Sequence, residues 1–187
     1  MKVHTLKLLA AGFLLSACGA KEAPPPVAPP KPVAEPVSAD SPAQATLAGA
    51  SGSTVTGTLQ LLSAPEGVSI VGQFTGLPPN TLHGFHVHET GDCSAPDAKS
   101  AGAHFNPANQ NHGGPEAAEH HLGDLPNVQS DATGIASISA TIAGATLHGG
   151  GPNDLMGKAL VVHAKRDDYV SQPAGDSGDR IACGVIR

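Results

Sequence analysis

The stretch GFHVHE, at Gly84–Glu89, alternates histidines with apolar residues. Residues two apart on a β-strand point to the same face, so His86 and His88 share one face. Phe85 and Val87 then point the other way, into a core. The stretch therefore predicts a strand that places two imidazoles within reach of one metal ion.

A second stretch, LVVHA at residues 160–164, repeats this arrangement. Leu160, Val162 and Ala164 share one face, which leaves His163 on the opposite face. A metal ion held by the histidines of both stretches would lie outside the sheet, against its surface.

A loop rich in glycine, asparagine and proline separates these two strands, and it carries four further candidates: His104, His112, His121 and Asp124. Such a loop can fold several imidazoles and a carboxylate around one point. Taken singly, each cluster also fits a surface strand or an ordinary loop hydrogen bond. Taken together, six histidines and one aspartate in three clusters indicate a site for two metal ions.

The rest of the chain also alternates with the period of a strand. In Gly67–Gly76 the side chains of Val68, Ile70 and Phe74 share one face. Similar alternation occurs in two further stretches, Thr54–Leu62 and Ala132–Ile142. Period-two patterns bounded by Gly, Pro and Asn are typical of antiparallel strands with one solvated face. We find no convincing amphipathic helix of about ten residues or more, and we predict an all-β domain.

The chain from about Thr54 to Arg187 resembles the copper–zinc superoxide dismutases. The resemblance rests on six stretches in the order of the family: LHGFHVHE at 82–89, AHFNP at 103–107, HGGP at 112–115, HLGDL at 121–125, KALVVHA at 158–164 and RIACGVI at 180–186. It implies an eight-stranded antiparallel Greek-key barrel or flattened sandwich with long metal-binding loops. It also implies the dismutation of superoxide to dioxygen and hydrogen peroxide.

Carried over onto this sequence, the resemblance implies a copper ion bound by His86, His88, His104 and His163. It implies a zinc ion bound by His104, His112, His121 and Asp124, so that His104 is shared between the two metals. Four imidazoles suit Cu(II), and three imidazoles with a carboxylate suit tetrahedral zinc. His120 is rejected as a ligand, because only His121 stands three residues before Asp124 in the family pattern.

The resemblance assigns roles to two further residues. Arg180 would place its guanidinium beside the open copper position, where it attracts and orients the anion. Its alternative role is to bond to loop carbonyls. Asp167 would accept hydrogen bonds from a copper histidine and a zinc histidine, His86 and His112, and so fix their orientation. Its alternative is a solvated loop acid.

The chain lacks the long charged loop that attracts the substrate in the animal enzymes. The loop Asp168–Asp179 is short and contains no lysine. The formal charge of the chain is −6, and it becomes −8 when two lysines leave with the signal peptide. Any attraction of an anion must therefore be local, and Lys99 or Lys165 is the candidate substitute. No basic patch indicates nucleic acid.

The first residues are typical of an export signal, with two lysines followed by a short apolar run. The sequence LSAC at 15–18 resembles the lipobox of bacterial lipoproteins, in which cleavage exposes a lipidated cysteine, here Cys18. The alternative is a plain secretory signal with a chance cysteine. Gly19, rather than aspartate, at the next position implies sorting to the outer membrane of a two-membrane bacterium, facing the periplasm.

Composition divides the chain into three parts. Residues 1–17 form the expected signal peptide, residues 18–45 the lipidated cysteine and a Pro/Ala-rich tether, and residues 46–187 the dismutase domain. A tether of this composition favours extended polyproline geometry at ~3.1 Å per residue. It would hold the folded domain away from the membrane to which Cys18 is anchored.

The remaining cysteines form an even pair, Cys93 and Cys183. An even pair in an exported protein predicts a disulfide. In the family such a bond ties the metal-binding loop to the strand that follows the active-site arginine. Closing a loop of this size stabilises the folded state by roughly 4–5 kcal/mol on the chain-entropy account.

The same fold is compatible with two functions other than catalysis. The domain could serve as an envelope copper-binding or chaperone protein, or as a structural surface lipoprotein with a relic fold. Relatives of these kinds commonly lose metal ligands or the arginine, whereas this chain keeps all seven ligands and Arg180. The sequence therefore favours the enzyme. It leaves open whether the enzyme is a monomer or a homodimer.

Overall fold

The computed structural model describes Ser38 and residues 41–187. The expected signal peptide, the lipid-bearing Cys18 and most of the tether lie outside the described residues. The described part contains one 3₁₀-helix, η1 (Lys99–Ala101), and nine strands: β1 (Ala43–Gly49), β2 (Thr56–Ala64), β3 (Gly67–Thr75), β4 (Leu82–His83), β5 (Phe85–His88), β6 (Val128–Gln129), β7 (Ala136–Ala143), β8 (Ala159–His163) and β9 (Arg180–Val185). It has no helix long and apolar enough to cross a membrane.

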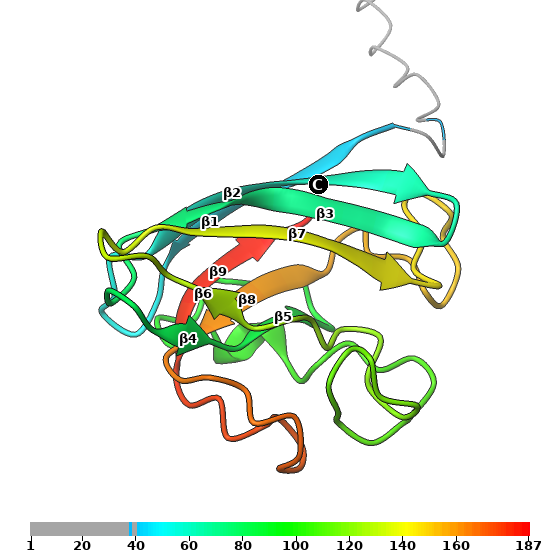
Figure 1. The fold of residues 1–187 in the computed structure, drawn as a ribbon. Coiled ribbons are helices and arrows are strands. Elements are labelled where there is room, and N and C mark those ends of the chain that lie inside the picture. The colour runs from blue at the N-terminus through cyan, green and yellow to red at the C-terminus, as the bar shows by residue number, and fades with distance from the viewer. Residues whose placement is uncertain (1–37, 39–40) are drawn as a thin grey trace, which may run out of the picture. The chain divides into compact units, whose positions relative to one another are not determined.

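Seven strands form one antiparallel sheet in the order β5-β8-β9-β1-β2-β3-β7, and β4 pairs with β6. The sheet curls, so that β1, β2, β3 and β7 form one layer and β9, β8 and β5 lie opposite (Figure 1). The all-β antiparallel prediction is confirmed. Only Gly84 separates β4 from β5, so these two count as one of the eight strands that the resemblance implied.

The core lies between the two layers and is built from alternate residues of each strand. Val68, Ile70 and Phe74 of β3 are fully buried, as their shared face predicted. Phe74 meets Phe85 of β5 edge to face, with ring centroids 5.2 Å apart. This contact joins the layers, and such aromatic pairs contribute about 0.5–1.5 kcal/mol beyond burial of area.

Two long loops emerge from the layer that contains β5 and β8. Loop A, residues 89–127, connects β5 to β6, and loop B, residues 164–179, connects β8 to β9. Both lie below the strands in Figure 1, in green and in orange. A side chain on Gly84 would clash with Ser177 of loop B, at 2.8 Å between the two Cβ atoms. Glycine therefore lets loop B lie directly against β5.

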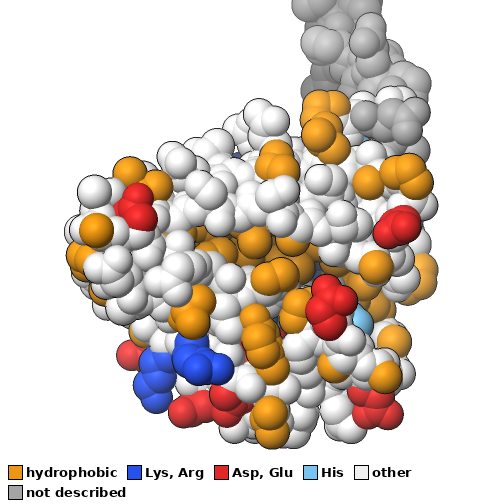
Figure 2. Space-filling view, in the orientation of Figure 1, with side chains coloured by type: hydrophobic (Ala, Val, Ile, Leu, Met, Phe, Trp, Pro, Cys, Tyr) orange, Lys and Arg blue, Asp and Glu red, His pale blue; other side chains and the backbone are white. Residues whose placement is uncertain are grey.

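Charge is distributed unevenly over the domain. The segments β1, β2, β3 and β7 contain no charged residue, and their outward side chains are mostly Ser, Thr and Gln. In Figure 2 the visible Lys and Arg side chains gather at the lower left, beside the loop that follows β8. Charged side chains thus lie on the loops rather than on the strands of this layer.

Candidate metal centre

Strand pairing assembles four imidazoles on the outer surface of the sheet. Antiparallel pairing of β5 with β8 sets His86 opposite Val161, so that the histidines of both strands approach each other. A single β-bridge to His88 brings His104 of loop A beside them. The ligand atoms of this four-histidine group lie within 4.8 Å of one another, and its members are all buried: His86, His88, His104 and His163.

The backbone alternation that the sequence predicted explains this position. Phe85 and Val87 lie in the main core, together with Leu160 and Val162. Val161 lies on the other side of the sheet, in a small second cluster with Cys183 and the alanines of η1. The histidines therefore face away from the barrel core, as expected for a metal site against the sheet.

The outward nitrogens of these rings are held by hydrogen bonds. Nδ1 of His88 donates to the carbonyl of Gly102 at 3.0 Å, and Nδ1 of His163 donates to the carbonyl of Gly178 at 3.2 Å. Their Nε2 atoms then face each other, 3.4 Å apart. Each outer bond fixes the ring orientation and leaves the inner nitrogen as an acceptor for a metal.

Two inner nitrogens have no hydrogen-bond partner in the described structure. Nδ1 of His86 and Nε2 of His104 are both buried and unpaired. Buried polar atoms without partners are rare, because the lost solvation costs about 1–3 kcal/mol. A copper ion bound by four nitrogens would satisfy both atoms, so the residues fit the metal that the resemblance implied.

The second group surrounds the carboxylate of Asp124. Nδ1 of His104 and Nδ1 of His121 lie 2.8 and 3.2 Å from Asp124 Oδ1. Nδ1 of His112 lies 3.1 Å from Asp124 Oδ2, but without hydrogen-bond geometry, so this nitrogen is also buried and unpaired. Three imidazoles and one carboxylate that converge in this way fit tetrahedral zinc. We call these four residues the Asp124 group.

His104 belongs to both groups through different nitrogens. Its Nδ1 faces Asp124, and its Nε2 is the unpaired atom on the side of the four-histidine group. The ligand atoms of the Asp124 group also lie within 4.8 Å of one another. A single imidazole therefore connects the two sites. His120 is outside both groups and donates from Nδ1 to the carbonyl of Ala117.

The electrostatics keep most of the imidazoles neutral. Burial lowers the pKa of His88 and of His163 well below its ordinary value, and burial lowers the pKa of His104 to about 4. Burial would also lower the pKa of His112, but the adjacent carboxylates of Asp124 and Asp167 outweigh it and raise that pKa to about 9. Neutral imidazole is the form that binds a metal.

Asp167 lies beneath both groups and connects them a second time. Its Oδ2 accepts from Nε2 of His86 at 2.6 Å, and its Oδ1 accepts from Nε2 of His112 at 3.0 Å. Burial opposes ionisation of this carboxyl, but the hydrogen bonds outweigh it and lower its pKa. An ionised Asp167 therefore orients one ring from each metal set.

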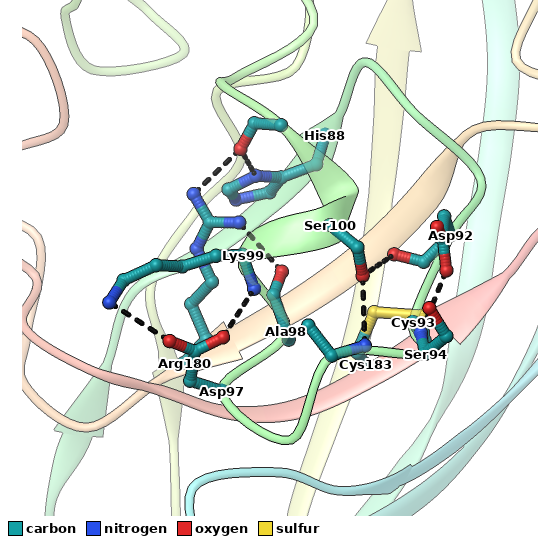
Figure 3. The surroundings of a disulfide bond; sticks show 12 residues. His88, Asp92, Cys93, Ser94, Asp97, Ala98, Lys99, Ser100, Arg180 and Cys183 are labelled. Atoms are coloured by element: carbon teal, nitrogen blue, oxygen red, sulfur yellow. Dashed lines mark hydrogen bonds and ion pairs between the residues drawn. A yellow bond between two sulfur atoms is a disulfide. The ribbon is translucent and has the colours of Figure 1, made fainter.

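Arg180 begins β9 and lines a cavity of about 620 Å³ together with His88, His104 and His163. Its guanidinium donates to the carbonyls of Ala98 at 2.8 Å and Gly102 at 2.6 Å. Figure 3 shows the guanidinium bonded to the carbonyl of Ala98, with His88 alongside. The two interpretations from the sequence are thus compatible, because the guanidinium bonds to loop carbonyls and still faces the cavity.

A disulfide holds the loop that supplies these carbonyls. Cys93 is bonded to Cys183 of β9, 90 residues away, as the cysteine count predicted. The hydroxyl of Ser100 donates to the carbonyl of Asp92 and accepts from the N–H of Ala95. The segment around η1 is therefore tied to the strand that carries Arg180 (Figure 3).

Each lysine suggested for steering is paired with an aspartate. Lys99 lies 2.9 Å from Asp97, and Lys165 lies 3.6 Å from Asp176. Such exposed pairs are weak, at about 0–1 kcal/mol, but they reduce the local positive field. Arg180 has no carboxylate within salt-bridge distance in the described part of the chain.

Two residues that the sequence did not single out also reach the centre. Asn127 follows Asp124 in loop A and bonds to the backbone of Asp167, and Gln172 of loop B bonds to the backbone of His112. Neither lies in a periodic pattern, although Asn127 stands two residues after the HLGDL motif at 121–125. The dipeptide Gln172-Pro173 gave no signal beyond its occurrence in a turn-rich loop.

Comparison with known proteins agrees with this geometry. Residues 55–186 match the family described as copper/zinc superoxide dismutase. Superoxide dismutase (Cu-Zn) 2 of Aquifex aeolicus is 44% identical over 136 residues, which cover 71% of this chain and 80% of that protein. Superoxide dismutase (Cu-Zn) 2 of Mesembryanthemum crystallinum is 41% identical over 139 residues, covering 71% of this chain and 86% of that protein.

Solved structures share the fold. A SOD-like protein from Bacillus subtilis is 36% identical, with a TM-score of 0.70, and the match covers 76% of this chain and 96% of that chain. The clock protein EA4 is 37% identical, with a TM-score of 0.71, covering 82% of this chain and 98% of that chain.

The family match includes the strands that carry the four-histidine group and the loop that carries the Asp124 group, since both lie within residues 55–186. Fold, relatives and ligand geometry therefore agree, and neither metal site lacks a ligand. The chain belongs to the copper/zinc superoxide dismutase family.

Proposed function

We propose that this dismutase removes superoxide at a bacterial cell envelope, where a lipid on Cys18 anchors it. The observation that supports the enzyme rather than a metal buffer is the joint presence of two ligand groups sharing His104 and of Arg180 facing the same cavity. The lipobox-like LSAC sequence and the Cys93–Cys183 disulfide support export, because disulfides persist in oxidising compartments.

The chain's residues divide the chemistry between them. Copper, when bound, supplies a one-electron couple, so that one superoxide is oxidised to dioxygen and a second, with two protons, is reduced to hydrogen peroxide. Arg180 attracts the anion into the cavity and orients it. Nε2 of His104 is the atom that takes up a proton and returns it, while Asp167 keeps His86 and His112 in place.

The Asp124 group has a structural part in this scheme. Zinc, when bound, would supply no redox chemistry, and the four residues of the Asp124 group would hold it and so close loop A around the shared imidazole. Nδ1 of His104 is thereby held on the zinc side, and only Nε2 is free to exchange a proton. Loop order and proton transfer are thus linked through one ring.

Metal removal and restoration test the enzyme. Both metals are stripped from the full-length chain, and copper and zinc are restored singly and together. We expect dismutation to return with copper, fully only when zinc is also present, and one copper and one zinc to bind per chain. Activity with zinc alone would contradict the copper assignment, and copper uptake without dismutation would support an envelope copper-binding protein instead.

A further inference from the structure

Each of the two long loops of the metal centre has a carboxamide side chain that bonds to the backbone of the other loop. Gln172 of loop B reaches the backbone of His112 in loop A, and Asn127 at the end of loop A reaches the backbone of Asp167 in loop B. Each carboxamide uses both its oxygen and its nitrogen. The contacts are separated by 60 and 40 residues along the chain, so they tie together segments that the sequence does not bring close.

The contact of Gln172 with His112 has the form of a short β-ladder. The N–H of His112 donates to Oε1 of Gln172 at 2.9 Å, and Nε2 of Gln172 donates to the carbonyl of His112 at 2.9 Å. Nε2 also donates to the carbonyl of Val170 at 3.3 Å, which holds the carboxamide in position. Both backbone groups of His112 are thus satisfied by one side chain.

Side chains rather than a regular element fix the backbone of this part of loop A: Asn106 bonds to Gln110, and Asp124 Oδ2 accepts from the N–H of Gly113 at 3.2 Å. Residues 109–114 belong to no helix or strand. Among the described residues, no backbone group bonds to the N–H or the carbonyl of His112. The ring of His112 is nevertheless buried, with Nδ1 aimed at Asp124 and Nε2 bonded to Asp167. Gln172 therefore makes the hydrogen bonds that hold the N–H and the carbonyl of this ligand.

The packing of loop B supports the same conclusion. A side chain at Gly175 would overlap both Asp167 Oδ1 and the His112 ring, and this glycine has a φ of +64°. Loop B thus lies in direct contact with the ligand that Gln172 holds. A shift of loop B by the width of a methyl group would displace both the carboxylate and the imidazole.

We propose that Gln172 is a positioning residue for zinc, which acts by holding the backbone of His112 so that Nδ1 points to the metal. His112 belongs only to the Asp124 group. Loss of the clamp should therefore weaken zinc retention and leave copper retention unchanged. This inference concerns metal retention and does not depend on the rate of dismutation.

The test compares metal release from the full-length chain loaded with copper and zinc. Gln172→Ala removes the side chain that holds His112. Gln172→Met keeps a side chain of similar length but removes both hydrogen bonds to the backbone of His112. Gln172→Asn retains the polarity and loses the reach. The matched control is Gln110→Ala, which removes an exposed glutamine two residues before His112 whose side chain makes no hydrogen bond within the described residues.

We expect zinc to leave the three Gln172 variants about tenfold faster than the wild type, the lower end of the usual effect of partners that orient ligands. Copper release should be unchanged, and Gln110→Ala should match the wild type. Co(II) placed in the zinc site should show altered visible bands in the Gln172 variants only. Wild-type zinc release in Gln172→Met, or equal acceleration of copper and zinc release, would overturn the proposal.

Discussion

Arg180 and His88 bond to the same atom, the carbonyl oxygen of Gly102. The guanidinium donates to it at 2.6 Å, and Nδ1 of His88 donates to it at 3.0 Å. The guanidinium that we propose attracts the substrate is therefore fixed in relation to a copper ligand by one backbone group. A charge held in this way need not reorganise when an anion arrives, which is the condition for electrostatic preorganisation.

We predict that Arg180→Ala lowers the second-order rate of dismutation by about tenfold or more, because it removes a fixed positive charge from the cavity. Two hydrogen bonds from a charged group to loop A are also lost, which should lower the free energy of unfolding by about 2–3 kcal/mol for the half-buried guanidinium. Metal content should not change. Arg180→Lys should recover part of the rate, since it keeps the charge but loses the planar fork.

Lys99→Ala and Lys165→Ala serve as controls for charge alone. Both lysines are paired with aspartates, so each variant should lose less rate than Arg180→Ala. The loss should disappear at high salt, because exposed charges are screened beyond ~10 Å at 0.1 M. Rates are measured across ionic strength for each variant. A wild-type rate for Arg180→Ala at low salt would contradict this account of substrate capture.

We predict that Asp167→Asn loosens both metals, because Asp167 accepts hydrogen bonds from one histidine of each set. An amide oxygen accepts more weakly than a carboxylate, and its NH₂ group cannot accept at all. Metal affinity should fall by about 10–100-fold, as is usual for such partners. Copper and zinc release from the loaded chain measure the effect.

Asp168→Asn is the matched control for this substitution. Asp168 accepts hydrogen bonds from Val170 and Ser171 within loop B and contacts no histidine. Because its amide oxygen can still accept the bonds that hold the turn, it should change both release rates far less than Asp167→Asn. If Asp167→Asn released only zinc, the contact with His86 would have no part in holding copper, and the bridging role would be wrong.

Residues of the strands could be placed from the sequence, because their side chains alternate with a period of two. The placement of His86 and His88 opposite Phe85 and Val87 followed from a period of two, and the structure confirms it. The alternation along a strand determines which face of the sheet a side chain lies on, but it does not determine how far that side chain lies from residues in the loops. The resemblance, not the period, indicated which loop residues join them.

The contacts between loop A and loop B could not be predicted from a periodic pattern. Gln172 and Asn127 are ordinary polar residues in loops, and their partners lie 60 and 40 residues away. Tyr169 and Asp176 have positive φ values of 63° and 48°. No local sequence pattern predicted these backbone conformations. Such conformations depend on the packing of loop B against loop A, and that packing exists only in the folded domain.

We predict that replacing both Cys93 and Cys183 with serine lowers the free energy of unfolding by about 2–5 kcal/mol, the usual effect of losing a native disulfide. The segment around η1 should then move more freely and hold the Arg180 guanidinium less well. The dismutation rate should therefore fall as well. Denaturant unfolding and rates on the loaded chain test both effects; a free thiol in the unreduced wild-type domain would contradict the bond.

We predict last that Cys18 carries the membrane anchor. The cleavage that LSAC directs would leave Cys18 as the first residue, and a lipid on its thiol would hold the chain to a membrane through the tether. Cys18→Ala should move the protein from the membrane fraction to the soluble envelope fraction, with a change in mass. Gly19→Asp is the control for sorting: it should keep the lipid but retain the protein at the inner membrane. Fractionation and mass measurement distinguish these outcomes, and a Cys18→Ala protein that stayed membrane-bound with unchanged mass would refute the anchor.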